Sequence, residues 1–251
     1  MKTRILLAIF LAIIITGCIK TIASEEAVMN PEFLHNKPFG ASAEELLSDK
    51  SFTSLKVEIQ YMPGFEPDQE VIYELWKFLH TYLNKPDGIS IVTRKIKASK
   101  DTVLTKAEVL SIERANRSSY TSGKEIALYV LYTNGEYTNS KILGYAYRNT
   151  SAVIFGKNIR ENSGQIGKPD RTRLESTVLL HEMGHLLGLV NEGSDMQENH
   201  KDNTHVSHCR NRKCLMYYGI EIEDKFGHLI KKGIPKLDEA CEADLKAKGG
   251  K

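Results

Sequence analysis

The chain has 251 residues with 34 basic and 32 acidic side chains, so its formal net charge is only +2. This balance argues against nucleic acid as a partner, because nucleic-acid binding needs a concentrated basic surface. Hydrophobic residues make up 41% of the chain, and the length beyond a short N-terminal leader suits one folded domain.

The N-terminus has the pattern of a secretory leader. Lys2 and Arg4 precede an apolar run over residues 5–15, which is too short for a comfortable membrane span. The sequence around Cys18 resembles a lipobox, which implies a signal peptide at residues 1–17 and a lipid-modified mature N-terminus at Cys18. An uncleaved anchor with an incidental cysteine is the alternative. In both cases we expect an extracytoplasmic protein held at a membrane of the cell envelope.

The segment after Cys18 favours a tether. Residues 18–51 are polar and contain Pro31 and Pro38, which suits a spacer between membrane and domain, although residues 43–47 are able to form a helical turn. We therefore expect the folded domain to cover residues 52–251.

Strand and helix patterns alternate through the first half of this domain. Leu55, Val57 and Ile59 alternate with polar residues, which predicts a half-buried strand. Apolar residues at helical spacing follow, and we expect Trp76 among them to pack in the core. Further strands are predicted at 89–97, 125–132, 142–147 and 152–155, and a helix opened by a capping box of Thr105 and Glu108 is predicted to about residue 116.

The stretch TRLESTVLLHEMGHLLGLV carries the strongest functional signal in the chain. Thr172 and Glu175 predict a capping box at the start of a helix, on which His181 and His185 share one face. Two imidazoles one turn apart bind one zinc ion, and Glu182 beside them is placed to take a proton from zinc-bound water. A chance motif on an amphipathic helix is the alternative.

The residues after this motif predict how the metal site is completed. Gly188 predicts a sharp turn that ends the helix and brings a third ligand back to the metal. The string HEMGHLLGLVN resembles the metzincin zinc peptidases, whose pattern is H-E-x-x-H-x-x-G-x-x-H or -D. This chain departs from the pattern at Asn191, because an amide is a poor zinc ligand.

A second pattern lies downstream, where a His-Cys pair is followed after four residues by Cys-x-Met. This pattern resembles that of the archaemetzincins, and the resemblance implies that His208 is the third zinc ligand and that residues 189–207 are an insertion. Asn191, His200 and His205 are the other candidates for the third ligand. His200 and His205 are also candidates for a second zinc site, and surface positions are the alternative for both.

The resemblance also assigns two residues near the base of the site. It implies that Met216 lies in the Met-turn beneath the zinc ligands, with an ordinary core methionine as the alternative. It implies less strongly that Tyr218 lies near the metal and donates to the oxyanion.

With Cys18 assigned to lipid, three cysteines remain. Outside the cytoplasm, a disulfide between Cys209 and Cys214 with Cys241 buried is the simplest expectation. A structural zinc held by all three and one nearby histidine is the alternative. Archaemetzincins carry a later cysteine pair for a second zinc, and only Cys241 remains here.

These patterns together predict an α+β fold of metzincin type. We expect a mixed β-sheet, a zinc-binding active-site helix, a Met-turn and a C-terminal helix at about residues 236–246. Residues 144–147 are the candidate for the edge strand that pairs with an extended substrate, and an ordinary sheet strand is the alternative.

The function that we expect is that of a zinc metalloendopeptidase-like hydrolase acting on peptides or proteins. Zinc would be bound by His181, His185 and His208, with Glu182 as the general base. The alternative is a non-catalytic zinc-binding lipoprotein that retains the fold. Asn191 favours that alternative, because it stands where the metzincin pattern has a zinc ligand. The presence of Glu182 argues against it, because Glu182 is not needed to hold the metal. The sequence fixes no oligomeric state.

Overall fold

The computed structural model describes residues 32–139, 141–220 and 233–251. The chain divides into two compact units, Met1–Asn36 and Lys37–Lys251. Within the first unit, the described residues include a short 3-10 helix, η1 (Phe33–His35). The predicted signal peptide and Cys18 lie outside the described residues. No helix in the described ranges is long and apolar enough to cross a membrane.

The second unit begins earlier in the chain than the sequence indicated. Its first helix, α2 (Ala43–Leu47), buries Leu46 and Leu47 in the main hydrophobic core. Residues that pack in the core are not part of a spacer, so the boundary predicted at residue 52 is too late. The polar composition of the surrounding segment hid this short apolar stretch.

A five-stranded mixed sheet has the order β2-β1-β4-β7-β6. Strand β1 (Ser54–Tyr61) pairs in parallel with β2 (Ile89–Lys95) and with β4 (Glu125–Thr133), and β4 pairs in parallel with β7 (Ser151–Phe155). Strand β6 (Gly144–Arg148) runs antiparallel to β7 at the end of the sheet. The predicted mixed sheet is therefore confirmed, and the predicted edge segment lies on its edge strand.

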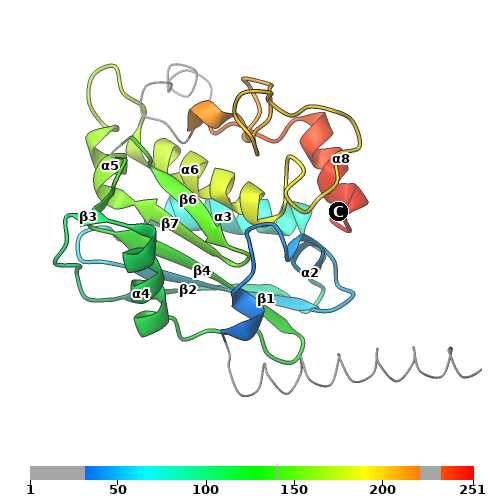
Figure 1. The fold of residues 1–251 in the computed structure, drawn as a ribbon, viewed down its shortest axis with the longest axis horizontal. Helices are drawn as coiled ribbons and strands as arrows, with labels where there is room; N and C mark the ends of the chain where they lie inside the picture. Colours follow the sequence, from blue (N-terminus) through cyan, green and yellow to red (C-terminus); the bar gives the residue numbers. More distant parts are fainter. Residues whose placement is uncertain (1–31, 140, 221–232) are drawn as a thin grey trace, which may run out of the picture. The chain divides into compact units, whose positions relative to one another are not determined.

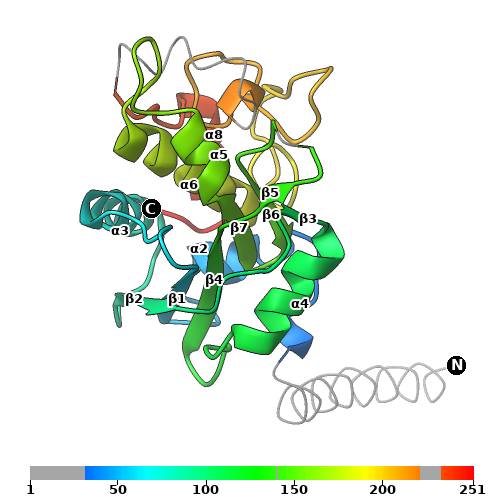
Figure 2. The same ribbon diagram turned by 90° about the vertical axis from the view of Figure 1, so that its left-hand side faces the viewer.

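Helices cover both faces of this sheet. Helices α3 (Gln69–Tyr82) and α6 (Arg171–Leu186) lie on one face, and α4 (Lys106–Asn116) lies on the other (Figure 1, Figure 2). The capping box predicted for α4 is present, because Thr105 and Glu108 bond reciprocally. The remaining elements are the paired strands β3 (Val103–Leu104) and β5 (Glu136–Tyr137), the helices α5 (Gly156–Glu161) and α8 (Glu239–Ala247), and the 3-10 helix η2 (Tyr218–Ile220).

The side chains of β4 divide the core into two layers. Leu128 and Val130 belong to the large cluster that includes residues of α3 and α6. Tyr129 and Leu131 point the other way and pack with Val109 of α4. A central strand between two helical layers is buried on both faces, and this burial explains the continuous apolar run in its sequence.

Strand β1 is also buried on both faces, and the prediction of a half-buried strand is wrong. Glu58 is 1% and Gln60 0% exposed. The carboxylate of Glu58 accepts hydrogen bonds from the backbone N–H groups of Ser118, at 2.9 Å, and Ser119, at 2.6 Å. The hydroxyl of Tyr129 donates to the side-chain oxygen of Gln60 at 2.9 Å. Polar residues are tolerated inside because they are hydrogen-bonded.

Helix α3 buries a different stripe from the one predicted. Val71, Leu75 and Phe78 face the core, whereas Trp76 is 42% exposed. The indole ring lies against the imidazole of His80, with ring centroids 4.0 Å apart. The prediction that Trp76 packs in the core is wrong, because the buried stripe passes one position before it and places its side chain at the edge of the exposed face.

Candidate active site

Helix α6 carries His181, Glu182 and His185, and it begins at a different cap from the one predicted. The side chain of Asp170 accepts a hydrogen bond from the backbone N–H of Arg173 at 3.0 Å, so Asp170 is the N-cap. The capping box predicted for Thr172 and Glu175 is wrong, because both residues already lie inside the helix. Thr172 instead donates its hydroxyl to Asp68 at 3.2 Å.

Glu175 is buried in the second turn of α6. Burial raises the pKa of its carboxyl to about 7, and the nearby carboxylate of Asp68 acts in the same direction. The cations Arg171 and Arg160 oppose this shift in pKa but do not cancel it. The helix therefore contains a carboxyl that holds its proton until near-neutral pH.

His181 and His185 converge one helical turn apart. Their Nε2 atoms lie 3.2 Å apart, close to the separation of about 3.3 Å expected for two imidazole nitrogens on one tetrahedral zinc. The Nδ1–H of His181 donates to the backbone carbonyl of Leu215 at 2.7 Å. This bond fixes the tautomer of His181 and leaves its Nε2 lone pair directed at His185.

His208 joins these two histidines from the loop that follows α6. The ligand nitrogens of His181, His185 and His208 all lie within 4.8 Å of one another. The Nδ1–H of His208 donates to the carbonyl of Val206 at 2.9 Å, which presents its Nε2 to the group. We call these three residues the three-histidine cluster. Three neutral imidazoles are the donor set of open zinc sites, which keep a fourth position for water or substrate.

The other candidates for the third ligand lie elsewhere. Asn191 is exposed, with a φ of 70°, and Val190 before it has a φ of 58°. Asn191 serves as a turn residue, since its backbone is left-handed. Gly188 opens this turn with a φ of 74°, and its carbonyl accepts from the N–H of Ser194 at 2.8 Å.

Glu182 lies directly beside the first histidine and is fully buried. Helix geometry places its side chain about 100° around the axis from His181, on the wall adjacent to the metal-facing stripe.

Met216 packs against α6 at Gly184, which lies between His181 and His185 in the helix. It is fully buried, and a side chain at Gly184 would place its Cβ 2.2 Å from the sulfur of Met216. Gly184, between the two helical histidines, is therefore needed for the close approach of Met216 to α6. The carbonyl of Met216 accepts from the N–H of Cys209 at 2.8 Å, which holds the His208 segment alongside.

Tyr218 is held by a stacked histidine. The rings of His205 and Tyr218 lie parallel, with centroids 3.4 Å apart and an interplanar angle of 3°. Asp202 fixes the turn before His205 by accepting from the N–H groups of Thr204, at 2.8 Å, and His205, at 3.0 Å. The structure thus assigns His205 to Tyr218 and not to the group of metal-binding nitrogens.

The three remaining cysteines form a second cluster. All three thiols are free and buried, so the predicted disulfide between Cys209 and Cys214 is wrong. The sulfurs of Cys214 and Cys241 lie 3.6 Å apart, and Nδ1 of His200 lies 3.4 Å from the sulfur of Cys209 and 3.8 Å from that of Cys241. We call these four residues the cysteine cluster. Two thiolates on one tetrahedral zinc are expected about 3.8 Å apart, so the spacing suits a metal.

Two acidic residues support this second cluster. Asp244 is fully buried, and its carboxylate lies 2.8 Å from Nε2 of His200, which turns Nδ1 toward the sulfurs. The pKa of His200 is raised to about 9, first by its hydrogen bond with Cys209 and then by Asp244. Asp238 lies 3.3 Å from the sulfur of Cys209 and belongs to the group able to hold a metal, but it also caps α8 by accepting from the N–H of Cys241.

Several supporting residues were not found from the sequence. The sequence contained a signal for the role of Gly184, because a glycine inside a helix, between the two histidines, is unusual and suggests close packing. Asp244 and the carbonyl of Leu215 had none, since their roles depend on contacts across 44 and 34 residues of sequence.

The fold has counterparts among solved structures. Archaemetzincin from Methanopyrus kandleri superimposes with a TM-score of 0.51 and 16% sequence identity over 78% of this chain and 96% of that chain. Metalloproteinase-II from Bacteroides fragilis superimposes with a TM-score of 0.46 and 13% identity over 80% of this chain and 54% of that chain. No family model and no curated protein matches the sequence. The chain therefore has the mixed α/β, mostly parallel-sheet fold of an archaemetzincin-like metallopeptidase.

Proposed function

We propose that this protein is a zinc-dependent metallopeptidase. The observation that carries the proposal is the convergence of His181, His185 and His208, with the buried carboxylate of Glu182 next to them. Three neutral nitrogen donors on rigid or hydrogen-bonded supports match an open zinc site. The archaemetzincin-like fold supports the same assignment.

Each chemical role in this proposal falls on a residue of this chain. Zinc bound by the three imidazoles supplies Lewis acidity to the carbonyl and to water. Glu182 takes the proton from the attacking water and returns it to the leaving nitrogen, because it is the buried carboxylate on the same helix. Leu215 keeps His181 in the tautomer that can bind the metal.

The proposed substrate is an extended peptide bound along β6. This strand is the antiparallel edge of the sheet, and its Gly144 lies against Val178, one helical turn before Glu182. An edge strand offers backbone N–H and C=O groups that hold a peptide without reading its side chains. Cleavage by such a site is expected in the interior of a peptide.

A structural zinc in the cysteine cluster is the second part of the proposal. Cys209, Cys241 and His200 belong, with Asp238, to a group whose ligand atoms all lie within 4.8 Å of one another. Cys214, with its sulfur 3.6 Å from that of Cys241, would give these residues the closed three-sulfur, one-nitrogen donor set of structural sites. Asp238 is less suited, because one of its oxygens caps α8 and the other accepts from the amide of Asn211 at 2.9 Å. The protein should therefore bind about two zinc ions.

We also propose that lipid on Cys18 holds the protein at a membrane outside the cytoplasm. The support is the leader-like sequence ahead of Cys18. A Cys18→Ala variant should stay unprocessed or leave the membrane fraction, because the several acyl chains of a lipoprotein provide stable anchoring. Normal processing and membrane retention of that variant would contradict this assignment.

Metal analysis combined with a peptide library tests the enzymatic assignment. The wild-type protein should cleave library peptides, and Glu182→Gln should keep its zinc yet lose roughly 10²- to 10⁴-fold in rate. A His181→Ala and His185→Ala double variant should lose about one of two zinc ions. His80→Ala is the matched control, because its partly exposed imidazole lies on α3 and belongs to neither cluster.

The outcomes separate the proposal from its alternative. A wild-type protein that binds zinc but cleaves no peptide would favour a non-catalytic zinc-binding protein. Unchanged turnover in Glu182→Gln would remove Glu182 from the mechanism.

A further inference from the structure

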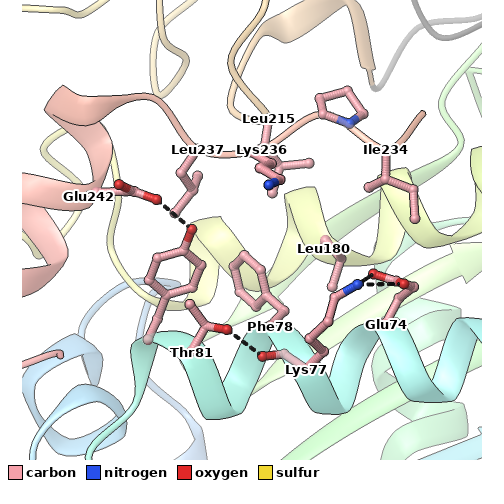
Figure 3. Close-up of a pocket in the computed structure, with 12 residues that line it drawn as sticks. Glu74, Lys77, Phe78, Thr81, Leu180, Leu215, Ile234, Lys236, Leu237 and Glu242 are labelled. Atoms are coloured by element: carbon pink, nitrogen blue, oxygen red, sulfur yellow. Dashed lines mark hydrogen bonds and ion pairs between the residues drawn. The ribbon is translucent and has the colours of Figure 1, made fainter. Parts of the chain in front are cut away.

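A cavity of about 500 Å³ lies on the side of α6 that faces α3. It is bounded by α3, by Leu180 of α6 and by the segment 234–237 (Figure 3). Its volume is within the range of about 300–1,000 Å³ that is typical of small-molecule sites. The residues around it include none of the three zinc-site histidines and not Glu182. The cavity is therefore distinct from the candidate active site.

Apolar side chains form the inner wall of this cavity. Phe78, Leu180, Leu215 and Leu237 line it, and each of them is at most 7% exposed. Figure 3 shows the ring of Phe78 extending from α3 toward the wall that carries Leu215 and Leu237. This wall suits the hydrocarbon part of a ligand.

Ion pairs and hydrogen bonds already satisfy most polar groups at the rim. Lys77 pairs with Glu74 at 2.5 Å on one side, and the hydroxyl of Tyr82 donates to Glu242 at 2.8 Å on the other (Figure 3). Lys236 is different, because its side chain is exposed at the rim and pairs with no carboxylate of the described residues. An exposed cation next to an apolar wall is complementary to a ligand with one negative charge and an apolar tail.

One residue connects this cavity to the metal site. The N–H of Leu215 donates to the carbonyl of Lys236 at 2.8 Å, and the carbonyl of Leu215 accepts from Nδ1–H of His181 at 2.7 Å. The side chain of Leu215 lines the cavity. A ligand that contacts Leu215 and Lys236 therefore acts on the residue that orients a zinc ligand.

We propose that this cavity binds a fatty carboxylate and that its occupancy slows zinc release from the three-histidine cluster. The apolar tail lies against Phe78, Leu180 and Leu215, and the carboxylate pairs with Lys236. A peptide is disfavoured as the occupant, because its backbone N–H and C=O groups would need more partners than this rim offers.

Binding of straight-chain carboxylates from hexanoate to tetradecanoate, measured by calorimetry on the purified zinc-loaded protein, tests the site. Affinity should rise by about fourfold per methylene until the tail fills the cavity, and then level off. Lys236→Gln should weaken dodecanoate binding about three- to tenfold and leave dodecanol binding unchanged. Lys213→Gln, which removes an exposed cation that does not line the cavity, is the matched control.

A second variant blocks the tail. Ile234→Trp adds bulk at the cavity wall and should abolish dodecanoate binding, with thermal melting used to verify that the variant is folded. Absence of dodecanoate binding to the wild type, or equal binding by wild type, Lys236→Gln and a folded Ile234→Trp, would overturn the site. Preferential binding of a short apolar peptide over dodecanoate would overturn the choice of ligand.

Zinc release to a chelator tests the connection to His181. Saturating dodecanoate should slow release from the three-histidine cluster about fivefold, a coupling of ordinary size for linked sites. The His181→Ala and His185→Ala double variant reports the cysteine cluster alone and provides the correction. An unchanged release rate with dodecanoate bound would overturn the coupling. The zinc-release experiment rests on the proposed zinc site, whereas the calorimetric binding experiment does not. Neither experiment requires peptidase activity.

Discussion

The two histidine-containing clusters are close in the chain but are built in different ways. In the three-histidine cluster, two donors lie one turn apart on α6 and only His208 comes from a loop. In the cysteine cluster, every donor comes from a different position between residues 200 and 241. The first cluster therefore rests on local helix geometry, and the second depends on long-range folding.

This difference in construction goes with a difference in chemistry. Three imidazoles leave a coordination position open, which catalysis needs, whereas three sulfurs and an imidazole close the shell, which suits a structural role. A rigid helix holds the open site without help from the metal. The cysteine cluster has Cys241 on α8 and its other donors in loops, so it would gain much of its order from a bound ion.

The largest expected effect is the loss of stability when a sulfur of the cysteine cluster is removed. Cys214→Ser should lose about one zinc and several kcal/mol of the free energy of unfolding, since structural zinc contributes on the order of 10 kcal/mol in small zinc domains. Zinc content and urea unfolding measure the two effects.

Asp238→Asn is the control that identifies the fourth donor. It should retain zinc better than Cys214→Ser, because Cys214 is the proposed ligand and Asp238 mainly caps α8. If Asp238→Asn loses the metal and Cys214→Ser retains it, then the carboxylate completes the cluster and our donor set is wrong.

The second-largest expected effect is a pH dependence of the free energy of unfolding, caused by Glu175 in α6. The pKa of Glu175 rises from an ordinary 4.5 to about 7 on folding, so the folded protein binds a proton that the unfolded chain releases between these values. Stability should therefore fall as pH rises through this window, by about 3 kcal/mol in total, and stay level above it. Glu175→Gln should remove this fall.

The measurement is the free energy of unfolding of wild type and Glu175→Gln from pH 4 to pH 8.5. The variant should gain stability over the wild type as pH increases while its zinc content stays the same. Parallel profiles for the two proteins would show that Glu175 ionises normally. A lower zinc content would show that the helix depends on Glu175 to position its histidines.

The smallest effect is expected from the carboxylate that supports His200. Asp244→Asn replaces a charged partner by a neutral amide and should weaken zinc binding at the cysteine cluster by about 10- to 100-fold. Competition with a chelator measures this affinity. Zinc bound by the three-histidine cluster should be unaffected, and weakening at both sites would mean that the clusters do not act separately.

The parts of the molecule that the sequence predicted are those set by local spacing. The period of two in β1, the β-prone run of β4 and the cap of α4 depend on neighbours a few residues away, and the structure has these elements. Spacing also selected His181 and His185. His208 came from a longer pattern, and the structure places it with those two residues.

What the sequence could not predict depends on tertiary contacts. The burial of Glu58 follows from a loop 60 residues away, and the exposure of Trp76 depends on which neighbours α3 has. The disulfide prediction failed for the same reason. It paired cysteines that are close in sequence, whereas Cys214 lies beside Cys241, 27 residues further on.

The contact of His200 with Cys209 has a consequence for the order of folding. The two residues are nine positions apart, and Arg210 donates its N–H to the carbonyl of His200 at 2.9 Å, so the segment between them forms a closed loop. Because His208 lies within that loop, closing it confines the third imidazole before any ion reaches the helix. We expect closure of this loop to carry the entropic cost of ordering His208. Metal should then bind first at the cysteine cluster and afterwards at the three-histidine cluster.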